Sequence, residues 1–332
     1  MLAPWLVVGA GSWGTALAMQ SARTGQATRL WGMDVSQWQD LRCNSLYFPE
    51  LPLPEQLTAY TDLATAAEGI NDFLLAVPSH AFTAVLQQLK PYLTPSSRVA
   101  WGTKGFDLER GQLLHEVAEA ELGADRPLAI LSGPSFALEV AEGLPTSVTL
   151  ASNNSQWCAD LTEYMHNDVF QCFTSADMCG VAIGGALKNI IAIAVGICDG
   201  LAMGANARCA LITRGLSELT QLGLAMGAQL ETLMGLSGLG DLVLTCTDDQ
   251  SRNRRFGLAL AQGHDVAAAE QHVGQVVEGK KAVKQAIKWT QEYALSCPII
   301  ETVYQMLYRG VACQSAMQAL MEHQPQQEFT RR

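Results

Sequence analysis

The segment that most constrains the fold lies near the start of the chain, where a short apolar run leads directly into a glycine-rich turn. Residues 5–8 (Trp-Leu-Val-Val) are typical of a buried strand, and residues 15–19 (Thr-Ala-Leu-Ala-Met) are typical of a helix. Between them, residues 9–14 read Gly-Ala-Gly-Ser-Trp-Gly, which has the spacing GxGxxG. In a strand-turn-helix unit the first glycine makes the tight turn, the second lets the backbone approach a pyrophosphate, and the third lets helix pack on strand. This order predicts a dinucleotide-binding unit, because the amides at the helix start face the phosphates.

Further apolar runs predict the other strands of an α/β domain. They occupy residues 28–32, 72–77, 98–101, 128–131 and 147–151. Helix-like segments, such as 80–90 and 110–121, lie between most of them, and this alternation predicts a Rossmann-like doubly wound parallel sheet over residues 1–177. Farther along, long apolar stretches separated by glycine predict an all-helical domain at 178–332. These stretches are 181–198, 206–223, 280–294 and 299–308.

Length, charge and cysteine content limit the class of protein. A chain of 332 residues suits two domains, and 32 acidic against 21 basic side chains give a net charge of −11. That balance disfavours nucleic acid or anionic lipid as a partner, so an anionic ligand would need a local basic pocket. The nine cysteines form no CxxC pair, which predicts reduced thiols in a cytoplasmic protein without a metal site. We expect no signal peptide, since no basic region precedes the first apolar run.

Ligands of doubly wound sheets bind beyond the carboxyl ends of the strands, so the residues after each predicted strand are candidates. These residues are Asp34, the segment 78–80, the segment 103–105 and the segment 133–135. Lys104 would otherwise be an ordinary exposed lysine, and residues 133–135 (Gly-Pro-Ser) an ordinary turn with a helix cap. Their place at the ligand edge favours a function. We expect His80 to be structural.

Lys188 is the one charged residue in the eighteen apolar residues 181–198. A charge near the middle disfavours a membrane span and favours a buried helix. The lysine would either extend its ammonium to the surface or pair inside the protein for structural reasons. Alternatively, it faces a cleft as a general acid or base, tuned by desolvation and by a nearby carboxylate or anion.

Two further segments carry polar side chains in the second half of the chain. Asp241 follows three glycines and would cap a helix, but it also shares a helical face with Thr245, where the two could contact a polyol and Lys188. Residues 248–257 form the densest basic cluster. Ser251 would cap a solvated helix there, whereas a helix start with serine, arginine and asparagine is also suited to bind phosphate.

Taken together, these motifs resemble those of the bacterial NAD(P)-dependent sn-glycerol-3-phosphate dehydrogenases. The matching stretches run through both predicted domains in order, which makes the resemblance far more specific than the glycine motif alone. They are residues 9–18, 77–81, 103–105, 132–137, 185–190, 204–208, 211–215, 238–246, 251–257 and 276–279. The resemblance implies interconversion of dihydroxyacetone phosphate and sn-glycerol 3-phosphate by hydride transfer with NADP or NAD, which supplies glycerophospholipid synthesis.

The resemblance also implies the roles of individual residues. Lys188 is the expected catalytic proton donor and acceptor, held in position by Asp241 and Asn189. The expected substrate contacts are Lys104, Gly133, Ser135, Lys188, Asp241, Ser251, Arg252 and Asn253. The expected cofactor contacts are Gly9, Gly11, Ser12, Trp13, Gly14, Lys104, Ala137, Arg252, Val276 and Glu278. No metal is required, because lysine ammoniums supply the electrophilic charge.

The sequence gives conflicting indications on cofactor choice. Asp34 lies 20 residues after Gly14, where a carboxylate accepts hydrogen bonds from the ribose of NAD and repels the 2′-phosphate of NADP. Met33 stands where relatives often have a basic or histidine side chain, and residues 280–282 (Lys-Lys-Ala) also depart from the family pattern. We therefore expect use of both cofactors.

Two other functions and the assembly remain open at this point. A dehydrogenase for another hydroxy acid would lack the phosphate cluster around Arg252, and a dinucleotide sensor without turnover would need no charged lysine in an apolar helix. The resemblance also leaves a homodimer open.

Overall fold

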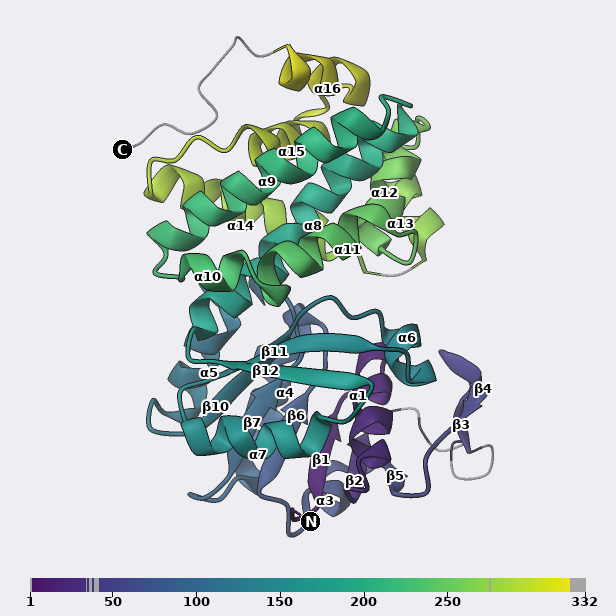
Figure 1. The fold of residues 1–332 in the computed structure, drawn as a ribbon, viewed down its shortest axis with the longest axis vertical. Helices are drawn as coiled ribbons and strands as arrows, with labels where there is room; N and C mark the ends of the chain where they lie inside the picture. Colours follow the sequence, from purple (N-terminus) through teal and green to yellow (C-terminus); the bar gives the residue numbers. More distant parts are fainter. Residues whose placement is uncertain (1, 34, 36–37, 39–41, 275, 323–332) are drawn as a thin grey trace. The chain divides into compact units, whose positions relative to one another are not determined.

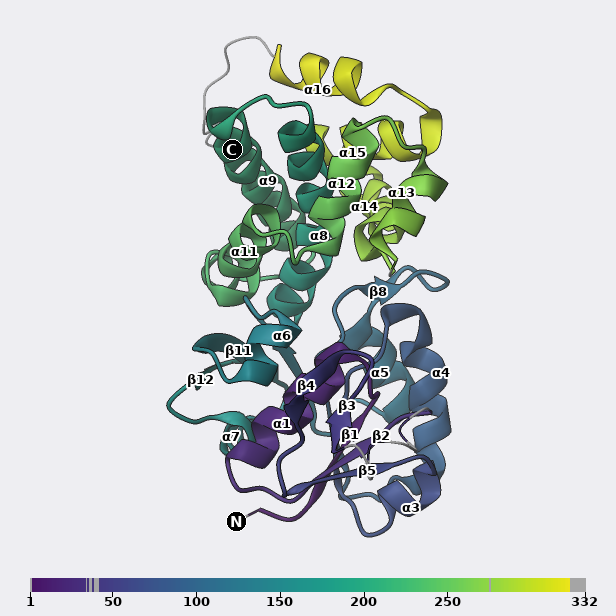
Figure 2. The same ribbon diagram turned by 90° about the vertical axis from the view of Figure 1, so that its right-hand side faces the viewer.

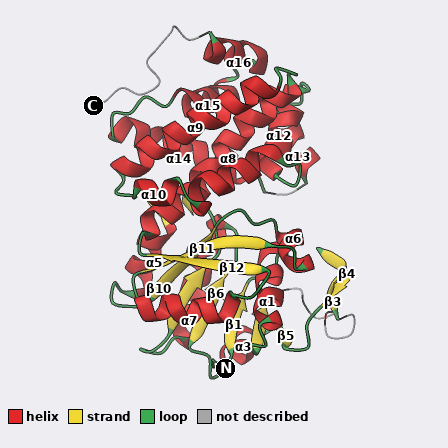
Figure 3. Cartoon of the chain, in the orientation of Figure 1, coloured by secondary structure: helices red, strands yellow, loops and turns green. Residues whose placement is uncertain are grey.

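The computed structural model describes residues 2–33, 35, 38, 42–274 and 276–322. The chain forms two compact units, Met1–Ala186 with Met226–Asp241, and Leu187–Ala225 with Leu242–Arg332. Strands occur in the first unit, whereas the described part of the second is helical, as predicted (Figure 3). The helix α8 (Met178–Gly200) contributes residues to both units. The functional boundary predicted before residue 178 stays a prediction.

The first unit is built on an eight-stranded sheet of order β12-β11-β10-β7-β6-β1-β2-β5 (Figure 1). Its strands are β1 (Trp5–Val8), β2 (Thr28–Trp31), β5 (Leu57–Tyr60), β6 (Asp72–Leu75), β7 (Arg98–Trp101), β10 (Leu128–Ser132), β11 (Thr146–Ser152) and β12 (Phe170–Ser175). Within the described sheet, every neighbouring pair except β10–β11 is parallel. The Rossmann-like fold class is therefore confirmed.

The strand β11 corrects one prediction. Its antiparallel pairing with β10 contradicts the expectation that residues 147–151 continue a parallel sheet. The link between the two strands contains a single six-residue helix, α6 (Ala137–Glu142), which is about 9 Å long and too short to carry the chain back to the start of β10. The strands β5 and β12, which lie at the two edges of the sheet, were not predicted from the sequence.

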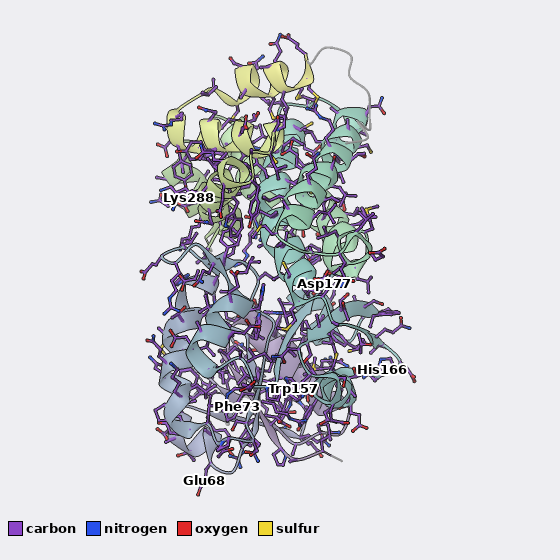
Figure 4. The ribbon with its side chains drawn as sticks, turned by 90° about the vertical axis from the view of Figure 1, so that its left-hand side faces the viewer. Glu68, Phe73, Trp157, His166, Asp177 and Lys288 are labelled. Carbon is purple, nitrogen blue, oxygen red and sulfur yellow. The ribbon has the colours of Figure 1, made fainter. Side chains whose placement is uncertain are left out.

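Helices pack on both faces of this sheet (Figure 2). The helices α1 (Ser12–Arg23), α6 and α7 (Ser155–Met165) lie together on one face, and α4 (Ser79–Leu89) and α5 (Leu114–Leu122) lie together on the other. The remaining short elements are α3 (Leu63–Ala67), the 3-10 turn η1 (Lys90–Tyr92), α10 (Leu230–Leu233) and the π-helical turn η2 (Leu236–Gly240). Figure 4 shows Phe73 and Trp157 in the interior of this unit and Asp177 at the start of α8.

Two hairpins complete the first unit. They are β3 (Cys43–Asn44) with β4 (Phe48–Pro52), and β8 (Phe106–Asp107) with β9 (Gln112–Leu113). The second hairpin occupies the start of the helix expected at 110–121, so α5 begins only at Leu114. Asp107 explains the difference, because its carboxylate accepts hydrogen bonds from the amides of Glu109 and Arg110 and turns the chain there.

The second unit packs around α8. Its other helices are α9 (Ala205–Ala225), α11 (Asp241–Thr247), α12 (Arg252–Ala261), α13 (Val266–Val273), α14 (Glu278–Glu292), α15 (Pro298–Arg309) and α16 (Cys313–Met321), although Asp241 itself belongs to the first unit. By length and composition α8 is the one described helix that could cross a membrane, with a mean hydropathy of 2.0, but its apolar window is entirely buried. That burial fits the core helix expected from the sequence.

Gly196 and Gly257 let the backbones of α8 and α12 pack in direct contact. A Cβ atom on Gly196 would lie 2.2 Å from the carbonyl oxygen of Arg254, and one on Gly257 would lie 2.3 Å from that of Ile193. Any side chain at either position would push the two helices apart. The close contact fixes the start of α12 relative to the middle of α8.

Candidate active site

Several of the predicted site residues follow strands of the first unit, at one edge of the sheet. Because β1, β6, β7 and β10 run in the same direction, their carboxyl ends meet at this edge. The loops that follow them hold residues 9–14, 78–80, 102–104 and 133–135. His80 is exposed in the first turn of α4. Asp34 lies outside the described residues.

The glycine turn has the geometry that a dinucleotide requires. Gly9 has φ +115°, and a Cβ atom on it would lie 2.7 Å from the carbonyl oxygen of Ala76. A Cβ atom on Gly14 would lie 1.8 Å from the carbonyl oxygen of Gly9, so a side chain at this third glycine would separate α1 from the turn. A Cβ atom on Gly11 would meet no described atom within 4 Å. Gly11 is the N-cap of α1, so this open space lies where the phosphate group would approach the helix amides.

Trp13 ties the start of α1 to the loop after β7. Its indole Nε1 donates to the carbonyl oxygen of Gly102 over 2.9 Å, one residue before Thr103 and two before Lys104. Ser12 is the first residue of α1 and is half-buried, and Ala137 is the first residue of α6 and packs against the core. Trp13 was predicted to contact the cofactor, but this link was not predicted from the sequence.

Lys104 joins three of the predicted substrate contacts. Its Nζ donates to the carbonyl oxygen of Gly133 over 3.0 Å and to Oδ2 of Asp241 over 2.7 Å. The hydroxyl of Ser135 donates to the same Gly133 oxygen over 2.9 Å. An ammonium has three N–H donors, and the described residues use two of those on Lys104. The third donor is available to a ligand, and the lysine side chain is 19% exposed.

A glycine-rich segment holds Asp241 in the interior. Asp241 is 1% exposed and follows the π-helical turn η2. A Cβ atom on Gly238 would lie 1.9 Å from the carbonyl oxygen of Leu233, and one on Gly184 would lie 2.4 Å from that of Ser237. These backbone contacts explain why the segment is rich in glycine. The π-helical turn itself was not predicted from the sequence.

The second unit brings another set of predicted residues together. Lys188 is 6% exposed on α8, next to Asn189. The amide Nδ2 of Asn253 donates to Oδ1 of Asn189 over 2.9 Å, and Oδ1 of Asn253 accepts the N–H of Gly279 over 2.9 Å. Asn253 therefore bridges α8, α12 and the first turn of α14, where Glu278 is the first residue.

The residues of the basic cluster at the start of α12 lie in different surroundings. Ser251 is the N-cap, and its hydroxyl accepts the N–H of Arg254 over 3.3 Å. Arg252 is exposed at the first helical position. Arg254 instead pairs with Asp199 over 2.7 Å and also contacts Asp249, so its role is structural.

Of the residues near the site where NADP and NAD would be distinguished, the structure describes Met33 and Arg29. Met33 is 90% exposed directly after the turn that follows β2. The guanidinium of Arg29 donates to the carbonyl oxygens of Thr65, Ala66 and Glu68 at the end of α3. Arg29 is thus engaged inside the first unit in capping that helix.

Cysteine and metal chemistry find no support in the described part of the chain. None of the nine cysteines, all of which lie in the described residues, forms a disulfide. No group of three or more His, Cys, Asp or Glu residues in this part is placed to hold a metal ion.

Comparison with known proteins places this geometry in a family. Models of the NAD-dependent glycerol-3-phosphate dehydrogenase N-terminus and C-terminus match residues 5–158 and 177–318. The glycerol-3-phosphate dehydrogenase (NAD(P)+) of Klebsiella pneumoniae is 49% identical over 319 residues, which are 95% of this chain and 94% of that relative. The chain belongs to the glycerol-3-phosphate dehydrogenase family.

Other members of the family show the same relationship. The glycerol-3-phosphate dehydrogenase (NAD(P)+) of Tolumonas auensis is 50% identical over 95% of this chain and 96% of its own length. The crystal structure of the glycerol-3-phosphate dehydrogenase from Coxiella burnetii matches with a TM-score of 0.92 and 49% identity, over 97% of this chain and 99% of that one. The family resemblance predicted from the motifs is therefore confirmed over nearly the whole chain.

Proposed function

We infer that the protein interconverts dihydroxyacetone phosphate and sn-glycerol 3-phosphate by NAD(P)-dependent hydride transfer. The observation that carries this conclusion is the near full-length identity to glycerol-3-phosphate dehydrogenases (NAD(P)+). The two groups of side chains around Lys104 and Asn253 support it, because they are the residues that the family motifs assign to substrate and cofactor. The product sn-glycerol 3-phosphate is the backbone precursor of glycerophospholipids.

The glycine turn fits a dinucleotide, and we propose that it binds one. Gly9, Gly11 and Gly14 let the pyrophosphate approach, and the amides of Ser12 and Trp13 donate to it. When bound, NAD(P)H supplies the hydride that reduces a ketone. The further cofactor contacts in this proposal are Lys104, Ala137, Arg252, Val276 and Glu278.

The substrate contacts divide by chemistry. Arg252, Ser251 and Asn253 bind the phosphate, which a helix start with a guanidinium favours. Lys104 directs its third N–H at a substrate oxygen, next to Gly133 and Ser135. Asp241 orients the electrophilic Lys104 through the observed ion pair. The same carboxylate is also the group expected to hold Lys188 in position.

Lys188 carries the proton in this mechanism. Its ammonium gives a proton to the oxygen on carbon 2 when the ketone is reduced, and its amine takes the proton back in the reverse direction. Lys188 is 6% exposed, so its side chain is largely shielded from water. Asn189, held by Asn253, fixes the helix position next to it.

The cofactor preference, compartment and assembly are further parts of the proposal. We propose that both NADPH and NADH are used, that the enzyme works in the cytoplasm, where its nine thiols stay reduced, and that it forms a homodimer. Sedimentation velocity of the purified chain tests the assembly. A monomer at all concentrations would contradict it.

A spectrophotometric assay tests the function as a whole. Loss of NADPH absorbance should require dihydroxyacetone phosphate, and oxidation of sn-glycerol 3-phosphate should restore the absorbance with NADP. A 2-oxo acid without phosphate serves as the control substrate. Turnover of that acid in preference would favour the rival dehydrogenase, and binding without any turnover would favour the dinucleotide sensor.

A further inference from the structure

The hairpin of β3 and β4 lies beside α1 (Figure 2). A buried side chain of the hairpin bonds to the first turn of this helix. Asn44, the last residue of β3, is 0% exposed. Its Nδ2 donates to the hydroxyl Oγ1 of Thr15 over 2.9 Å. Thr15 is fully buried and directly follows Gly14, the last glycine of the dinucleotide turn. No part of the function derived so far uses either side chain.

Hydrogen bonds at both ends fix the orientation of the Asn44 side-chain amide. Its Oδ1 accepts the N–H groups of Leu46 and Tyr47, each over 3.3 Å, which orders the tip of the hairpin. Because Oδ1 is occupied in this way, the amide must present its Nδ2 to Thr15. The hydroxyl of Thr15 then accepts from Asn44, and its own proton is left to donate.

The proton of Thr15 has one acceptor within reach in the described structure. Oγ1 lies 3.5 Å from the carbonyl oxygen of Ala10, a long hydrogen bond inside the glycine turn. In a trans peptide the carbonyl and the following N–H point in opposite directions. A carbonyl of Ala10 that faces Thr15 therefore directs the N–H of Gly11 to the opposite side of this peptide, away from Thr15.

We propose that Asn44 and Thr15 are positioning residues that set the direction of the Gly11 amide for the pyrophosphate of NAD(P)H. The chain runs from Asn44 Nδ2 to Thr15 Oγ1 to the Ala10 carbonyl, and it preorganises the turn before the cofactor arrives. This inference rests on the proposed dinucleotide binding. It predicts a specific energetic signature, because the pyrophosphate is common to both cofactors and distant from the 2′-phosphate.

Thr15→Val is the decisive variant, since it keeps the shape of the side chain and removes the hydroxyl. We expect the Kd of NADH and of NADPH, measured by calorimetry without substrate, to rise by the same factor of about five to ten, which is the worth of one net hydrogen bond. The kcat at saturating cofactor and the KM for dihydroxyacetone phosphate should not change. Thr15→Ser keeps the hydroxyl and should bind both cofactors like the wild type.

Thr28→Val is the matched control. Thr28 is a buried threonine at the start of β2, at the opposite end of the strand from the cofactor, and its hydroxyl bonds Ser21 and the carbonyl of Gln26. We expect this variant to lower the melting temperature and leave both Kd values unchanged. A Thr28→Val protein with the same loss of affinity as Thr15→Val would show that general destabilisation causes the effect, and the inference would be wrong.

Asn44→Asp tests the direction of the chain. An aspartate still accepts the N–H groups of Leu46 and Tyr47 but cannot donate to Thr15, so the hydroxyl turns from Ala10 to the carboxylate. We expect weaker cofactor binding than in the wild type, and no additional loss when Thr15→Val is added. If Thr15→Val binds both cofactors like the wild type, the positioning role is refuted. If the wild-type protein itself fails to bind NADH and NADPH, the proposed function fails instead.

Discussion

The ammonium of Lys104 donates to the carboxylate of Asp241 over 2.7 Å, between residues that are 137 positions apart in the chain. Asp241 is 1% exposed, so its carboxylate bonds to groups inside the protein, whereas Lys104 keeps a partly exposed face. The pair therefore serves the fold and the site together. It fixes the ammonium in one place while one of its N–H donors stays available to a ligand.

The dual role of this pair predicts different effects on stability and on rate. Lys104→Met should lower the free energy of unfolding by about 3 kcal/mol, because it removes one partner of a buried ion pair. Adding Asp241→Asn should restore most of that stability but none of the turnover. Urea unfolding and steady-state kinetics measure the two quantities. Recovery of turnover in the double variant would exclude Lys104 from the proposed chemistry.

Lys188→Ala should fold and bind NADPH yet lose at least about a hundredfold in kcat, the usual contribution of a positioned acid or base. The measurement is kcat at saturating substrate, with circular dichroism as the check on folding. Lys288→Ala is the control, since Lys288 is an exposed lysine on α14 (Figure 4). Near-normal kcat in Lys188→Ala would remove this residue from the mechanism.

Arg252→Ala should mainly weaken binding of the phosphate substrate. Loss of a charge-assisted hydrogen bond costs about 1.5 to 3 kcal/mol, so kcat/KM for dihydroxyacetone phosphate should fall about ten- to a hundredfold, with some loss of cofactor affinity. Arg254→Ala provides the contrast, because Arg254 pairs with Asp199. It should reduce stability more than substrate affinity. Unchanged kcat/KM in Arg252→Ala would refute the phosphate role.

Glu218 should make the stability of the second unit depend on pH. Its carboxylate is 4% exposed and accepts the N–H groups of Ile299 and Ile300 over 2.7 and 3.0 Å at the start of α15. Burial raises its pKa to about 7, above the ordinary value of 4.5. The folded protein therefore binds more protons than the unfolded chain between these values.

It follows that the contribution of Glu218 to stability is largest below the unfolded pKa and is lost as the pH rises through about 7. We expect the free energy of unfolding to fall over this range in the wild type and to fall less in Glu218→Gln. Urea titrations on both sides of the range provide the test. Equal pH dependence in the two proteins would contradict the assignment to Glu218.

The enzyme should use both cofactors with modest discrimination, on the order of tenfold or about 1.4 kcal/mol. Met33 is exposed and apolar, so it offers no charge to a 2′-phosphate, and Arg29 is engaged with the end of α3. The ratio of kcat/KM for NADPH and NADH at saturating dihydroxyacetone phosphate measures the preference. A ratio beyond about a thousandfold in either direction would show that this interpretation is wrong.

Local pattern was sufficient to predict the features that depend on neighbouring residues. The turn at Gly9, Gly11 and Gly14 was predicted because strand, turn and helix follow one another directly. Gly9 and Gly14 have steric reasons that act within a few residues or on the adjoining strand, whereas Gly11 leaves open space. Lys188 was recognised because one charge in an apolar helix is conspicuous in the sequence itself. The long helices α8, α9, α14 and α15 followed from their apolar periodicity, whereas α13 and α16 were not predicted.

Contacts between distant residues were decided by the tertiary structure. The antiparallel course of β11 depends on how a short link returns the chain, and the edge strand β12 pairs only once β11 is in place. The ion pair of Lys104 with Asp241, the bridge made by Asn253 and the attachment of Asn44 to Thr15 have no sequence signature. The physical reason is that local preferences act over a few residues, whereas the partner of a buried polar group is set by the packing of segments that are far apart in the chain.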